Sequence, residues 1–386
     1  MCPSDVQPLE SRRCAPGESP FKALFMEPPP RYPAAPLGTE AMSFTAQLSR
    51  SPRDDVFERA RADSVEFPYL LSNHLPMALA VLERLGASPE RMEAWSETYR
   101  AANRLVPIPP PVAPIERAHW DDALGDRARE ADYRRFFAGE VVRLGASEAV
   151  RFYLPSLVQG VAASATHPLM RLAYGLLEEN DGEVATALGY WATCFLPLPA
   201  PTGASPDTDD PAEVLAGVAA IEGARTYEPE TDLLWHNIRA VAALPGFRPV
   251  VDRLAFGPDT PRRMAATALA LFVGTMDFAA LHALTGLHWV RIVAPHLDDS
   301  AALYRAFWQV IASLVPKIGF PSLPSGEALE AMRRRAAPPW SAIRAAAIRS
   351  DDEHDVSLAY SCLQEEAVWG DPLYRVAAAR RLGLIA

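Results

Sequence analysis

Five of the eight histidines stand where a buried metal site would need them, most of them inside or beside apolar, helix-like sequence. They are His74, His167, His282, His288 and His354. Neutral imidazole is the commonest ligand for transition metals in proteins. A helical protein that buries several imidazoles either gives each ring its own hydrogen-bond partner or gathers the rings around an ion. These residues are therefore candidates for a metal centre built from distant segments, with separately hydrogen-bonded histidines as the alternative.

His74 and His167 each stand just before a proline that favours the start of a helix, Pro76 and Pro168. Proline is common at the first helical position, which places His167 at or near the N-cap. The positive end of a helix disfavours an imidazolium, so the ring is expected to be neutral, as a metal ligand must be. The alternatives are a capping role for His167 and a turn hydrogen bond to the backbone for His74.

His282 and His288 lie six residues apart in one predicted helix. Six residues rotate a side chain by about 240° net, so the two rings do not share a face. At most one of them is expected to reach a given centre, unless Gly286 breaks the helix. The alternative for either is a core histidine whose nitrogens are satisfied by neighbours.

His354 is predicted to lie in the first turn of a helix, because Ser350 and Glu353 have the spacing of a capping box. The nearby carboxylates of Asp352 and Asp355 would favour a cation, although acids at a helix start are also ordinary complements of the helix dipole. The remaining histidines are interpreted as surface or structural residues: His119, His236 and His296.

The elements that must position these rings are helices. From Asp54 onward the pattern is helical, as in Leu75–Leu85, with Gly86 as a left-handed cap and Ser88 opening the next helix. No apolar-polar alternation flanked by turns is present, so strands are not expected. The proline-rich residues 106–114 and the loop at 197–211 interrupt the helices. We predict a single all-α domain at 51–386, preceded by a disordered proline-rich tail at 1–50.

Composition narrows the function. The 386 residues are 49% hydrophobic and 22% charged, as in ordinary soluble proteins, and the net charge of −11 argues against nucleic-acid or acidic-membrane partners. The apolar stretch from Met264 to Met276 is too short to span a bilayer. No secretion signal is visible, and the four cysteines lack the C-x-x-C spacing, so a reduced cytoplasmic protein is expected.

Common cofactor and catalytic motifs are absent from the sequence. Without G-x-G-x-x-G there is no support for a Rossmann flavin or NAD(P) site, and no Walker A, H-E-x-x-H or G-x-S-x-G motif occurs. A site in such a chain must form by tertiary convergence of side chains from several helices. The sequence leaves the catalytic residues themselves unassigned.

Several segments, in their order and spacing, resemble the questin oxidase-like family across roughly residues 55–386. The most specific are His167-Pro168-Leu169-Met170-Arg171-Leu172-Ala173-Tyr174 and Leu281-His282-Ala283-Leu284-Thr285-Gly286-Leu287-His288, with Asn73-His74, Leu85-Gly86-Ala87-Ser88-Pro89-Glu90 and Asp352-Glu353-His354 in support. The family includes fungal enzymes that oxidatively open an anthraquinone ring in aromatic polyketide pathways and are often described as Baeyer–Villiger-type oxidases.

The resemblance implies an all-α fold with a mononuclear metal, expected to be iron. A family member holds its iron with several histidines and a carboxylated lysine. Carried over to this chain, the ligands would be His74, His167, His282 and His354, with His288 as a second choice.

One departure from the family concerns the lysine, which in relatives follows the last histidine shortly. Here no lysine is near His354, and Lys317 is distant in sequence. The remaining options are Asp355, Asp352 or water as a replacement, a different metal, or a degenerate site.

The resemblance therefore implies an oxygenase that acts with O₂ on an aromatic, quinone-like polyketide substrate. Aromatic side chains are candidates for lining its pocket, with core packing as the alternative reading: Trp95, Phe152, Tyr153, Trp191, Trp289 and Trp308. A second hypothesis is a non-catalytic helical protein that binds an aromatic small molecule with an incomplete metal site. A third is a helical scaffold, which would expose large apolar patches. The exact substrate and the oligomeric state are left open.

Overall fold

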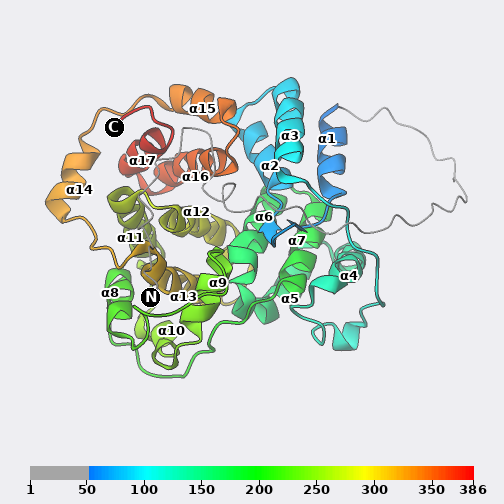
Figure 1. The fold of residues 1–386 in the computed structure, drawn as a ribbon, viewed down its shortest axis with the longest axis horizontal. Helices are drawn as coiled ribbons and strands as arrows, with labels where there is room; N and C mark the ends of the chain where they lie inside the picture. The colour runs from blue at the N-terminus through cyan, green and yellow to red at the C-terminus, as the bar shows by residue number, and fades with distance from the viewer. Residues whose placement is uncertain (1–51) are drawn as a thin grey trace, which may run out of the picture. The chain divides into compact units, whose positions relative to one another are not determined.

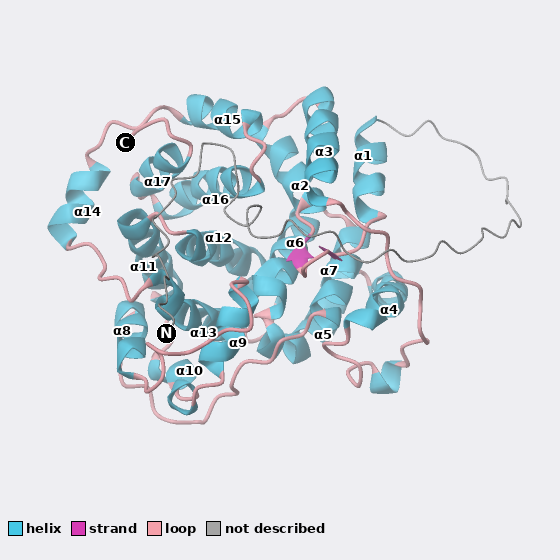
Figure 2. Ribbon diagram, in the orientation of Figure 1, coloured by secondary structure: helices cyan, strands magenta, loops and turns pink. Residues whose placement is uncertain are grey.

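The computed structural model describes residues 52–386, with side chains from Asp55 onward. The predicted tail at 1–50 lies outside the described residues. Within them, seventeen α-helices and one pair of two-residue strands are joined by loops and short 3₁₀ turns (Figures 1 and 2). The expected all-α fold class is confirmed. Among the described helices, none combines the length and apolar character needed to cross a membrane.

The helices run in the order α1 Pro52–Arg61, α2 Leu75–Leu85, α3 Pro89–Asn103, α4 Glu130–Leu144, α5 Ala146–Leu157, α6 His167–Leu177, α7 Asp181–Thr193, α8 Pro211–Gly217, α9 Leu234–Ala242, α10 Val250–Arg253, α11 Thr260–Thr275, α12 Phe278–Val293, α13 Ser300–Ile318, α14 Gly326–Arg333, α15 Trp340–Arg349, α16 Glu353–Trp369 and α17 Leu373–Arg381. The strands are β1 Glu66–Phe67 and β2 Leu71–Ser72, paired antiparallel between α1 and α2.

Four helices from distant parts of the chain form a closed ring of contacts. Helix α2 packs against α6 and α16, and α12 packs against the same two helices. Figure 1 shows α12 and α16 beside each other, with α6 next to α7. Each of the four carries one of the predicted metal-ligating histidines, so the packing of this ring decides whether those side chains can meet.

The ends of these helices follow from local chemistry. His74 is the N-cap of α2, Pro76 lies in its first turn, and Gly86 ends it in the left-handed region at φ 91°. The Ser88 side chain accepts a hydrogen bond from the Arg91 amide and opens α3, as predicted. Proline and glycine thus mark the start and end of α2 as expected from their backbone preferences.

Gly286 does not break α12, which continues from Phe278 to Val293. A β-carbon at Gly286 would lie 2.2 Å from the Phe307 ring of α13. The glycine therefore serves close helix packing, and the six-residue spacing keeps His282 and His288 on different faces, as predicted.

Two sequence-based expectations are corrected. Strands were not expected, yet β1 and β2 exist, because two-residue strands are too short to produce a recognisable alternation. The N-cap of α16 is Asp352, whose side chain accepts from the His354 amide, rather than Ser350. The Ser350 hydroxyl instead accepts from the Asp352 amide at 3.1 Å. His354 still lies in the first turn of the helix.

Candidate metal centre

The structure brings His74, His167, His282 and His354 into one cluster. The centroids of neighbouring rings are 4.4 Å apart for His74 and His167, 6.0 Å for His167 and His282, 5.7 Å for His282 and His354, and 5.2 Å for His354 and His74. The four rings therefore form a closed circuit, with one ring from each helix of the α2–α6–α12–α16 ring. We call these four side chains the histidine cluster.

Backbone carbonyls fix the tautomer of three rings in the histidine cluster. Each Nδ1 lies at hydrogen-bond distance from one carbonyl oxygen: His74 from Ser72 at 2.9 Å, His167 from Ser164, and His282 from Phe278 at 2.9 Å. A carbonyl can only accept, so each Nδ1 must carry the proton. The Nε2 atom of a neutral ring then presents a lone pair, which is the form a metal binds.

Two of these lone pairs face each other. The Nε2 atoms of His74 and His167 are 2.8 Å apart, with the rings nearly perpendicular at 85°. Burial lowers the pKa of His74 well below its ordinary value and that of His167 to about 4. Neither ring therefore holds a second proton near neutral pH that could bridge the two nitrogens. Two buried acceptors at this distance repel, and a cation bound to both would relieve the repulsion.

His354 differs from the other three rings because its Nδ1 faces a carboxylate. Burial lowers its pKa, but the hydrogen bond with Asp352 at 3.2 Å and the charge of Glu353 outweigh burial and raise it. Asp352 also accepts from Arg381 at 2.9 Å. Burial raises the pKa of Asp352, yet His354 and Arg381 together hold it below its ordinary value.

The spacing of potential ligand atoms sets a limit on the cluster. Within residues 52–386, the one group of three histidine, cysteine or acidic residues whose ligand atoms all lie within 4.8 Å of one another is Asp352, Glu353 and His354. Nitrogens sharing a metal at about 2 Å each lie roughly 3 Å apart. The Nε2 atoms of His74 and His167 have this spacing. No three of the four clustered histidines have ligand atoms that all lie within 4.8 Å of one another.

The second-choice ligand, His288, lies outside the histidine cluster. Its ring is buried, and Nδ1 donates to the Glu365 carboxylate at 2.7 Å, which Arg291 also binds. The Nε2 atom of His288 has no hydrogen-bond partner among the described residues. Asp355 is bound by Arg381 at 2.6 Å and by the Ser350 hydroxyl at 2.8 Å, so of the two proposed acids only Asp352 touches the cluster.

The other histidines and the aromatic residues have ordinary surroundings. His119 is exposed, and His236 is buried with Nδ1 2.7 Å from the Thr231 hydroxyl. Of the aromatic residues considered for a pocket, Phe152 is 64% exposed and the others are buried in the core: Trp95, Tyr153, Trp191, Trp289 and Trp308.

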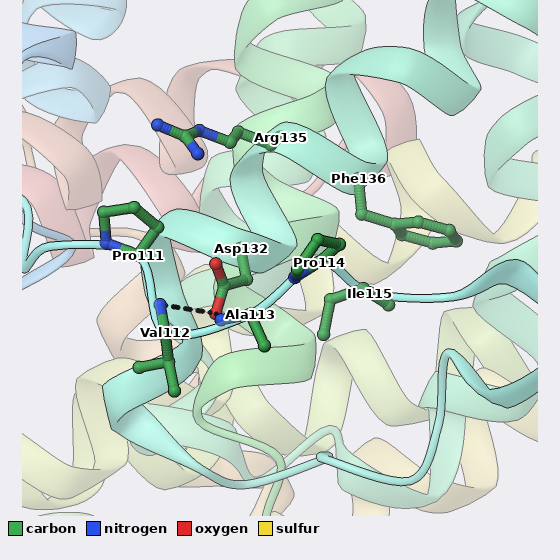
Figure 3. A pocket seen from close by; sticks show the side chains of 8 residues that line it. All are labelled: Pro111, Val112, Ala113, Pro114, Ile115, Asp132, Arg135 and Phe136. Atoms are coloured by element: carbon green, nitrogen blue, oxygen red, sulfur yellow. Dashed lines mark hydrogen bonds between the residues drawn. The ribbon is translucent and has the colours of Figure 1, made fainter.

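A surface hollow of about 370 Å³ lies between the proline-rich segment 111–115 and α4 (Figure 3). Its lining includes Val112, Phe136 and Asp132, whose carboxylate accepts from the Val112 amide at 3.1 Å. The hollow contains none of the four clustered histidines, and is therefore a separate feature of the surface.

Sequence reasoning missed the backbone that presents His167. Ser164, Ala165 and Thr166 all have positive φ, at 43°, 54° and 70°, and none is glycine. Each such residue stores strain of about 1–3 kcal/mol, and such strain is concentrated at functional sites. No residue type in this segment signals the turn. Thr166 is the N-cap of α6, so the strained turn directly sets where His167 begins its helix.

These features define the molecule as an all-α protein with a buried cluster of four imidazoles contributed by four helices. The chain belongs to the questin oxidase-like family, whose model matches residues 71–362. The matched range includes every histidine of the cluster. A search of curated proteins found no match. Family membership suggests an oxidase or oxygenase acting on polyketide-like substrates.

Proposed function

We propose that this protein is a metal-dependent oxygenase that uses O₂ to cleave or modify an aromatic, quinone-like polyketide. The metal we propose is iron, held by His74, His167, His282 and His354. The observation that carries the proposal is the pair of facing Nε2 acceptors 2.8 Å apart in a buried site. Imidazole nitrogens are ligands that suit iron, and two facing acceptor nitrogens are costly to bury without a cation.

The residues of the chain have distinct roles in this proposal. When bound, iron would supply the one-electron chemistry that lets O₂ react with an aromatic ring. Asp352 orients His354 through Nδ1, and the carbonyls of Ser72, Ser164 and Phe278 orient the other rings. The Phe278 ring packs 4.9 Å from His282 and 4.8 Å from His354, giving the cluster an apolar neighbour suited to a flat substrate.

A carboxylated lysine does not complete this site from the position used in relatives. Lys317 is on α13 and pairs with Asp232, which is exposed. Asp352 is the better placed of the two acids considered as replacements, because it contacts His354 whereas Asp355 contacts Ser350 and Arg381. We therefore propose Asp352, or water held near it, in place of the lysine.

The surroundings of the described cysteines are compatible with a reducing compartment. Cys194 and Cys362 are both buried and free, as expected for a protein that does not depend on disulfides. We include a cytoplasmic location in the proposal on this basis.

The test is metal analysis followed by oxygen consumption. Protein loaded anaerobically with Fe(II) and desalted is expected to retain about one equivalent of iron, and to consume O₂ with a hydroxyanthraquinone. His167→Gln is expected to lose the metal, whereas His288→Gln, a matched buried histidine outside the cluster, is expected to keep it. Retention below about a tenth of an equivalent in the unaltered protein would refute the proposal.

A second candidate function is a non-catalytic binding protein for aromatic small molecules. The missing lysine and the wider spacing of His282 and His354 favour it. It predicts that a hydroxyanthraquinone raises the melting temperature while O₂ consumption stays at background. Turnover dependent on added iron excludes this alternative.

A further inference from the structure

The two carbonyls that orient the facing imidazoles belong to serines whose hydroxyls also meet. Ser72, at the end of β2, and Ser164, in the strained turn before α6, have their Oγ atoms 3.0 Å apart. Both serines are buried. The main-chain oxygen of each therefore orients one imidazole, while its side chain contacts the other serine.

A tyrosine from a third element, helix α7, contacts both serines of this pair. The Tyr190 hydroxyl, from α7, lies 2.9 Å from Ser72 Oγ and 2.8 Å from Ser164 Oγ. The tyrosine is fully buried, and burial raises the pKa of its hydroxyl well above the ordinary value, so the group stays protonated. Tyr190 is thus hydrogen-bonded to both segments that carry the facing histidines.

The serine pair is also anchored to a charge. Ser164 Oγ donates to the Glu66 carboxylate at 2.6 Å, and Arg127 binds the same carboxylate at 2.7 Å. Hydrogen bonds to an ionised carboxylate are stronger than those between neutral groups. Ser164 makes this bond from the left-handed region at φ 43°, a conformation that non-glycine residues rarely adopt.

We propose that Tyr190 is a positioning residue for the metal centre, and that it sets the separation of the His74 and His167 Nε2 atoms through Ser72 and Ser164. The inference rests on the proposed metal-binding function. His74 and His167 enter from α2 and α6, and the carbonyls that orient them are linked directly only through the contact between the Ser72 and Ser164 hydroxyls. The hydroxyl of Tyr190 contacts both serines and so fixes the geometry of this link, as groups behind metal ligands commonly do.

The test is Tyr190→Phe, which keeps the packed ring and removes only the hydroxyl. The matched control is Tyr133→Phe, because Tyr133 is equally buried and its hydroxyl donates to the Trp120 carbonyl at 2.8 Å, away from the cluster. Co(II) affinity is measured by competition with a chelator, together with the visible absorption spectrum of the Co(II) form. We expect Tyr190→Phe to weaken Co(II) affinity by about 10- to 100-fold and to alter the spectrum. Both are expected to be unchanged in the control. Equal affinity and spectra in the two variants would overturn the positioning role.

Ser164→Ala provides an independent variant of the same unit. The double variant with Tyr190→Phe is expected to lose less Co(II) affinity than the product of the single losses, because the two residues act together. Fully multiplicative losses would show that the tyrosine and the serine act separately, and would overturn the proposed coupling.

A metal-free measurement separates this inference from the proposed function. Two-bond ¹H–¹⁵N spectra report which nitrogen of each imidazole is protonated. We expect Nδ1 protonation of His74 and His167 in the unaltered protein and in Tyr133→Phe, and mixed tautomers in Tyr190→Phe. If the unaltered protein binds no metal, the oxygenase proposal fails, and a tautomer change in Tyr190→Phe would still show that Tyr190 positions the two imidazoles. Unchanged tautomers would refute the role of Tyr190 alone.

Discussion

Replacing His167 with glutamine is expected to make the metal-free protein less sensitive to acid. Burial lowers the pKa of His167 from 6.5 to about 4, so the unfolded chain takes up this proton at a higher pH than the folded one. The stability of the folded state is therefore complete above pH 6.5 and is lost as the pH falls toward 4. The proton linkage of this one ring costs about 2 kcal/mol between pH 7 and pH 5, and about 3 kcal/mol by pH 4.

Urea unfolding at pH 7 and pH 5, after chelation of metals, measures this linkage. The difference in unfolding free energy between the two pH values is expected to be smaller in His167→Gln by about 2 kcal/mol. His119→Gln, at an exposed histidine, serves as the control and is expected to behave like the unaltered protein. If His167→Gln and the unaltered protein lose the same free energy on acidification, the reasoning from burial is wrong.

Three further results are expected. Metal binding at pH 6 should release about one proton, because His354 is the histidine of the cluster whose pKa is raised, whereas burial lowers the pKa of the other rings. Calorimetry in two buffers of different ionisation enthalpy measures the number of protons released. A release of no proton, or of several, would contradict this expectation. Gly286→Ala should destabilise the protein by about 1–3 kcal/mol in urea, since the new β-carbon would lie 2.2 Å from an aromatic ring, whereas Gly139→Ala, with open space at its β-carbon, should not. His288→Leu should lower the free energy of unfolding by about 1–3 kcal/mol, because it removes the buried hydrogen bond to Glu365. A lower melting temperature together with an unchanged iron content would show that this histidine is structural.

Local sequence signals predicted individual helices and their ends, but not how the helices pack so that four histidine rings come close together. The prolines after His74 and His167 located two helix starts, and the six-residue spacing separated His282 from His288. These signals depend on backbone preferences within a few residues. Shifting the N-cap of α16 from Ser350 to Asp352 is an error of two residues, typical of helix boundaries.

The grouping of the four rings could not be obtained from spacing alone. Only the family resemblance proposed His74 and His354 as partners, because their proximity depends on how α2 packs against α16. The strained turn at 164–166 and the contact of Tyr190 with two serines are also invisible in the sequence. Non-glycine residues adopt positive φ only when tertiary contacts impose it, and no local pattern records those contacts.

The imidazoles of the cluster enter from positions 74 to 354, which spans most of the described chain. Closing so long a loop is among the slower events of folding, and nothing shorter than that span can assemble all four donors. An ion that needs all four donors cannot be captured before the segment that carries His354 has been made and α16 has packed against α2. A bound ion would link the segments near His74 and His354 and would slow their separation when the protein unfolds.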